Sequence, residues 1–108
     1  MANSYKDALT QLEKAQEAMN AQDISHVPAA QLVNFERSKA AVYGEIQALQ
    51  ARQISARDED YAAITTEFRD CKSELTDLSN WVFAREARDR NLLTMLTKGV
   101  SIALSILI

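Results

Sequence analysis

The side chains that could take part in catalysis are few, and their spacing does not favour it. His26 is the only imidazole in the chain and lies close to Asp23 and Ser25. A Ser–His–Asp triad needs a fold that brings the three groups together beside an oxyanion hole, and neighbouring residues of one loop rarely provide that geometry. We therefore expect His26 to have a capping or surface role, and we predict that the protein is not an enzyme.

One cysteine and one histidine are also too few for a zinc site or a disulfide framework. Cys71 is expected to be a small buried hydrophobe, because a reactive cysteine needs exposure and a lowered pKa. The acidic run Asp58, Glu59 and Asp60 is typical of a helix start, where the helix dipole favours negative charge. The sequence has no Gly-rich phosphate loop, so we expect no cofactor, no metal and no small-molecule substrate.

Composition places the chain in the all-α class. Its 108 residues are 47% hydrophobic and 25% charged, a balance typical of globular proteins. Two glycines and one proline are too few for the turns of a β-sandwich or barrel. The net charge is −3 and the basic residues are mostly interspersed with acidic ones, so nucleic acid is not an expected partner.

Apolar residues three and four positions apart predict where the first two helices lie. The first runs from about Ser4 to about Ala21, and Ser4 with Asp7 resembles a capping box. A loop over 22–27 follows. Pro28 then opens the second helix, because proline is tolerated in the first turn. The apolar positions of this second helix are Leu32, Phe35, Val42, Ile46 and Leu49.

Two features of the second helix need separate interpretation. Gly44 lies mid-helix on another face, which is more typical of a close approach between helices than of a break. After Leu49 the heptad phase slips by one residue. We favour a tight turn near 53–56, and the alternative is a continuous helix that absorbs the slip as an eleven-residue repeat.

The third predicted helix has the most regular apolar seam in the chain. Its spacing alternates between three and four residues, and Trp81 and Phe83 widen the apolar face at its end. We therefore predict an antiparallel helical hairpin or a three-helix coiled-coil bundle, followed by a hydrophobic C-terminal helix. The predicted oligomer seam consists of Tyr61, Ile64, Phe68, Cys71, Leu75, Leu78 and Val82.

The last seventeen residues are the most apolar part of the chain. On a helix their polar side chains fall within about 100° of arc, which leaves an apolar arc of about 260°. We therefore divide the chain into a helical domain over 1–91 and a hydrophobic helical segment over 92–108. The residues of this segment predicted to contact a membrane or line a pore include Leu92, Leu93, Thr94, Leu96, Lys98, Ser101, Leu104, Ser105 and Leu107.

Three environments would cover such an arc. A transmembrane helix of this length would reach about 26 Å, against about 30 Å of hydrocarbon, with Lys98 near its centre at a cost of roughly 2.5–3.5 kcal/mol. Several copies in an oligomeric pore would turn the polar stripe inward. A soluble bundle or oligomer would bury the arc and leave the stripe at its surface.

The residues before this segment favour the membrane slightly. Trp81 suits a membrane interface, and Arg85, Arg88 and Arg90 form a basic collar, although a solvated salt-bridged helix face explains the arginines equally well. The N-terminus has no signal peptide. We therefore expect synthesis in the cytoplasm and membrane association through the C-terminus.

The sequence as a whole predicts a non-enzymatic helical assembly protein. In the leading hypothesis, residues 92–108 insert into or anchor to a membrane, alone or as part of an oligomeric pore. The alternative is a soluble homo-oligomeric adaptor, chaperone or structural subunit, of a phage particle or a secretion apparatus, with the same segment buried in the interface. In both cases the expected partner is a second copy or another helical protein.

Overall fold

The computed structural model describes residues 4–52, 60–89 and 92–107, with the side chains of 86–89 excepted. Within these ranges the protein is all-helical, which confirms the predicted fold class. Its helices are α1 (Tyr5–Ala21), the single-turn 3₁₀ helix η1 (Ile24–His26), α2 (Ala29–Ala51), α3 (Thr66–Asp70), α4 (Lys72–Asp89) and α5 (Thr94–Leu107).

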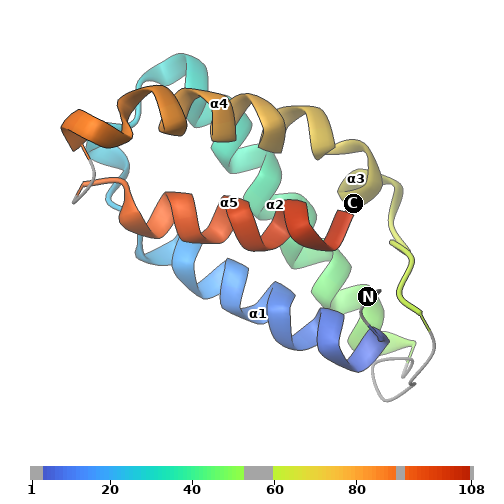
Figure 1. Cartoon of the computed structure of the whole chain (residues 1–108). Helices are drawn as coiled ribbons and strands as arrows, with labels where there is room; N and C mark the ends of the chain where they lie inside the picture. The colour runs from blue at the N-terminus through green and yellow to red at the C-terminus, as the bar shows by residue number, and fades with distance from the viewer. Residues whose placement is uncertain (1–3, 53–59, 90–91, 108) are drawn as a thin grey trace.

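The four long helices form one bundle of 41 × 24 × 21 Å in which each helix runs antiparallel to the next (Figure 1). α1 packs on α2 and α5, and α4 packs on the same two helices from the other side. The most extensive contact joins α1 to α5, the first and last helices of the chain. The predicted hairpin or three-helix arrangement is not confirmed, because α5 packs as a fourth long helix.

A single hydrophobic core runs through the bundle. Buried side chains of α1, α2, α4 and α5 belong to one contiguous cluster. The two parts that we divided at residue 91 therefore share this core, and independent folding of residues 1–91 stays a prediction. The largest fully buried apolar side chains are Phe35, Phe68, Leu12, Met19, Leu49, Leu75, Leu78, Leu93 and Leu96.

The close approach between helices occurs at Gly99 and not at Gly44. A Cβ atom at Gly99 would lie 2.7 Å from the Cγ of Met19 and 3.1 Å from the carbonyl oxygen of Ala15, so α5 contacts the backbone of α1. A Cβ atom at Gly44 would have no neighbour within 4 Å. Our interpretation of Gly44 was therefore wrong, because α2 turns that position away from its neighbours.

The ends of the first two helices agree closely with the bounds predicted from the sequence. The Ser4 side chain accepts a hydrogen bond from the Asp7 backbone N–H at 3.1 Å, as the predicted cap requires. α2 begins one residue after Pro28 and ends at Ala51. Because residues 61–64 are not helical, a continuous helix through this region is wrong, and the predicted turn at 53–56 lies outside the described residues.

The third predicted helix begins later than its apolar spacing suggests. Residues 61–64 are extended, and α3 begins at Thr66, after Thr65 has capped it by accepting from the backbone N–H of Phe68 at 3.2 Å. Cys71 then separates α3 from α4. The extended conformation has a cause elsewhere in the chain, which is the side chain of Glu45 on α2.

Candidate functional site

Glu45 is a buried carboxylate that holds the extended segment 61–65 against α2. It has no exposed surface. One carboxylate oxygen accepts from the Tyr61 hydroxyl at 2.5 Å and from the backbone N–H of Ile64 at 2.8 Å. The other oxygen accepts from the backbone N–H and the hydroxyl of Thr65, each at 2.8 Å. Four donors replace the water lost on burial, so this carboxylate is fully hydrogen-bonded.

This cluster is a structural site, because its hydrogen-bonding capacity is used within the chain. Burial, followed by the hydrogen bond to Glu45, raises the pKa of Tyr61 well above its usual range. Tyr5 packs against Tyr61 edge to face, with ring centroids 5.5 Å apart. Sequence reasoning passed over Glu45. The available signal was its register, three residues after Val42 and four before Leu49, on the apolar face of α2.

Gln22 forms a second buried polar cluster, at the opposite end of the bundle. Its side-chain amide donates to the carbonyl of Leu92 at 2.7 Å, and its amide oxygen accepts from the backbone N–H of Leu96 at 2.8 Å. Gln22 is buried, with only 7% of its surface exposed. Gln22 therefore satisfies a backbone donor in the first turn of α5 and fixes that end of the helix to the end of α1.

The predicted oligomer seam lies inside the protein's own core. Five of its seven residues are buried, and Tyr61 and Ile64 are partly buried against the same cluster. Burial within one chain leaves the five buried side chains little surface for a second copy. The five buried seam residues are Phe68, Cys71, Leu75, Leu78 and Val82.

Cys71 is positioned as an inert core residue. It is buried, and its thiol lies 3.1 Å from the carbonyl oxygen of Phe68. Burial and then the negative charge of Glu74 raise the pKa of the Cys71 thiol to about 12. A thiol that stays protonated is a poor nucleophile.

The polar and apolar residues of the predicted membrane segment separate onto opposite sides of α5. Leu93 and Leu96 are buried, Leu104 and Leu107 are half-buried against the core, and Leu92 is exposed just before the helix. The polar stripe, which consists of Thr94, Lys98, Ser101 and Ser105, is exposed along its length.

The predicted interface residues are only partly described. Trp81 is half-buried against the core, and Arg85 is exposed on α4. The side chain of Arg88 and the whole of Arg90 lie outside the described residues. No helix of the described chain has both the length and the hydrophobicity needed to cross a membrane.

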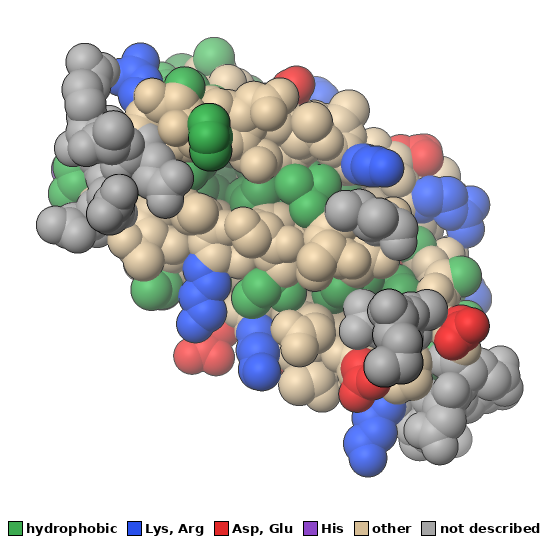
Figure 2. Space-filling model, viewed as in Figure 1, with side chains coloured by type: hydrophobic (Ala, Val, Ile, Leu, Met, Phe, Trp, Pro, Cys, Tyr) green, Lys and Arg blue, Asp and Glu red, His purple; other side chains and the backbone are tan. Residues whose placement is uncertain are grey.

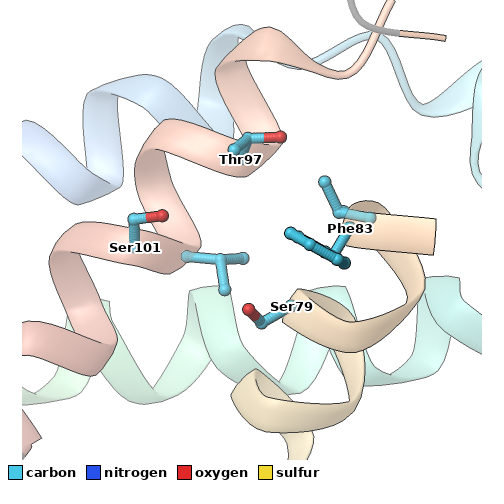
Figure 3. Close-up of a pocket in the computed structure, with 6 residues that line it drawn as sticks. Ser79, Phe83, Thr97 and Ser101 are labelled. Atoms are coloured by element: carbon cyan, nitrogen blue, oxygen red, sulfur yellow. The ribbon is translucent and has the colours of Figure 1, made fainter. Parts of the chain in front are cut away.

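A groove between α4 and α5 is the clearest surface feature near these residues. It is an open hollow of about 200 Å³ with Val82 and Val100 at its base. Figure 3 shows Ser79 and Phe83 on α4 facing Thr97 and Ser101 on α5 across this hollow. We call it the α4–α5 groove and define it by these six residues. Figure 2 shows apolar side chains along the furrow between the same two helices.

The three loop residues weighed for catalysis, Asp23, Ser25 and His26, are exposed. His26 is on the surface at 3.8 Å from the Asp23 carboxylate. Asp23 accepts a hydrogen bond from the backbone N–H of Ser25, and that bond is the main cause of its lowered pKa. Among the described side chains, no group of three or more His, Cys, Asp or Glu residues could hold a metal ion.

The chain matches no known protein family, no curated protein and no solved structure.

Proposed function

We propose that the protein is a non-enzymatic helical assembly protein that acts through protein–protein contact as a compact bundle, as a soluble adaptor, chaperone or structural subunit does. The observation that carries this proposal is the packing of α5. Its buried residues face α1 and α4, while Lys98 and the rest of its polar stripe face solvent. A helix that packs between two neighbours can bury a wide apolar arc against both of them. The wide apolar arc predicted for residues 92–108 therefore does not require lipid to cover it.

Vesicle flotation of the full-length chain tests this proposal. We expect the protein to stay in the aqueous fraction with vesicles of neutral or anionic lipid, because the apolar side of α5 is already buried. Lys98→Leu should lower solubility without changing helical content, since Lys98 is exposed. Strong flotation of the native, untreated protein would contradict the proposal.

A second candidate function is membrane engagement by α5 after it leaves the bundle. It is favoured by the amphipathic character of α5, whose apolar side would rest in a lipid interface with Lys98 and its stripe toward water. In this proposal the protein associates with a membrane through its C-terminal helix.

Matched glycine variants test the second candidate. Gly99→Ala should loosen the contact between α5 and α1, because the new methyl group meets Met19 and Ala15. If release of α5 matters, this variant should bind vesicles more strongly than the wild type, and Gly44→Ala should not. Equal binding by both variants would exclude release of α5 as the route to the membrane.

A further inference from the structure

Phe83 is the most exposed large hydrophobic residue of the described chain. It is 79% exposed, whereas the next two, Tyr43 and Val33, are 52% and 51% exposed. An aromatic ring in water loses the free energy that burial would provide. Single exposed apolar residues are common on protein surfaces, but Phe83 stands beside the hollow that its own helix forms with α5.

The described lining of the α4–α5 groove carries no charge. Its six residues are two valines, one phenylalanine and three hydroxyl residues. Four further hollows in the described part of the chain each include charged or titratable side chains. The hollow between α2 and α4, for example, includes Arg37, Glu67, Asp70 and Glu74.

An uncharged hollow suits the centre of a pair formed with a second copy. At a two-fold axis each group lies next to its own copy, so any charge near the axis meets a like charge and costs free energy. A self-complementary face also needs a projecting group and a recess close together. The α4–α5 groove has both, since the Phe83 ring projects at the edge of the hollow.

We propose that two copies of this chain pair about a two-fold axis through the α4–α5 groove, and that each Phe83 ring enters the groove of the other copy. The inference rests on the proposed function as an assembly protein and names its partner. The valine base would receive the ring, and the small side chains Ser79 and Ser101 allow the helices to approach closely.

The bundle is large enough for such a pair. A stable interface buries about 800 Å² on each partner, and a bundle that extends 41 × 24 × 21 Å has sides of that order of area. Pairing would add α4 and α5 of one copy to those of the other, so the interface would consist of four packed helices.

Sedimentation velocity over a concentration series tests the pairing. We expect a reversible dimer for the wild type. Phe83→Ala should raise the dimer Kd by about a hundredfold or more. In a symmetric dimer the substitution removes both rings, and aromatic residues at the centre of an interface contribute much of its binding free energy. Val33→Ala and Tyr43→Ala are matched controls at exposed positions outside the groove, and their dimer Kd should be unchanged. Circular dichroism verifies that each variant is folded.

A cysteine at the same position gives an independent readout. Phe83→Cys should be captured as a covalent dimer by a short bifunctional thiol-reactive cross-linker, because the pairing places both thiols in the same interface. Val33→Cys should not. The native Cys71 is buried and does not compete.

The outcomes separate this inference from the proposed function. A monomer at every concentration overturns the pairing. A dimer that Phe83→Ala leaves intact also overturns it, but that dimer still supports the proposed function as an assembly protein. Phe83-dependent flotation on vesicles would identify lipid as the occupant of the groove. That result would overturn both the pairing and the proposed function.

Discussion

The Tyr61 hydroxyl donates to the Glu45 carboxylate at 2.5 Å, across sixteen positions of sequence. With the bonds from Ile64 and Thr65, it holds the chain in an extended conformation before α3. We expect Tyr61→Phe to lower the free energy of unfolding by about 1.5–3 kcal/mol, the usual range for a hydrogen bond to a charged group. Glu45→Ala should cost more, because it leaves all four donors of the segment without their acceptor. Urea denaturation followed by circular dichroism measures both, and Glu36→Ala at an exposed position should have little effect.

Alkaline pH should destabilise the protein through Tyr61 and Cys71. Both groups have raised pKa values in the folded chain, that of Cys71 being about 12 against an ordinary value of 9.0. The unfolded chain therefore loses these protons at lower pH than the folded chain. Their contribution to stability is complete below about pH 9 and is lost as pH rises above it.

The measurement is the urea midpoint between pH 8 and pH 11, compared between variants. Its decline should be shallower in Tyr61→Phe and in Cys71→Ala than in the wild type. An unchanged slope in both variants would show that other groups cause the alkaline loss.

The two glycines of the chain should respond in opposite directions to alanine. Gly44→Ala should raise the free energy of unfolding by up to about 1 kcal/mol, because alanine favours the helix and nothing lies near its methyl group. Gly99→Ala should lower it by about 1–3 kcal/mol, since overpacking against α1 outweighs the helix preference. Thermal unfolding compares the pair directly, and two changes of the same sign would contradict the close contact between α5 and α1.

Deletion of residues 92–108 should unfold the bundle or leave a molten state. The division of the sequence at residue 91 predicts the opposite outcome, which is independent folding of residues 1–91. The packing argues against it, because removal of α5 uncovers the faces of α1 and α4 that pack on it, including Met19 of α1. A cooperative unfolding transition in the truncated chain would restore the original division at residue 91.

The positions of the helices could be predicted because spacing determines which residues share a face. The apolar residues of α1 and the seam from Phe68 to Val82 are buried as their register requires. Spacing cannot show what covers a face, however. The apolar side of α5 suits lipid, a second copy or its own chain equally well, and the close contact of Gly99 with α1 depends on residues eighty positions away.

The Glu45 cluster lay beyond sequence reasoning for a related reason. A glutamate in a helix is usually exposed, and its burial here depends on donors that lie sixteen to twenty positions later in the chain. The spacing of Tyr61 and Ile64 fits a helical seam, but four hydrogen bonds to one carboxylate stabilise an extended segment instead. Long-range hydrogen bonds thus overrode local periodicity at this point.

The extensive contact between the first and last helices has a consequence for biosynthesis. While the ribosome is still making the middle of the chain, the apolar side of α1 has no α5 to cover it. The bundle can complete its core only after residues 92–108 have left the exit tunnel, so the earlier helices have to wait for α5 before their packing is complete. During that interval nascent chains expose the surface that chaperones recognise, and a stalled or prematurely terminated chain would keep it exposed.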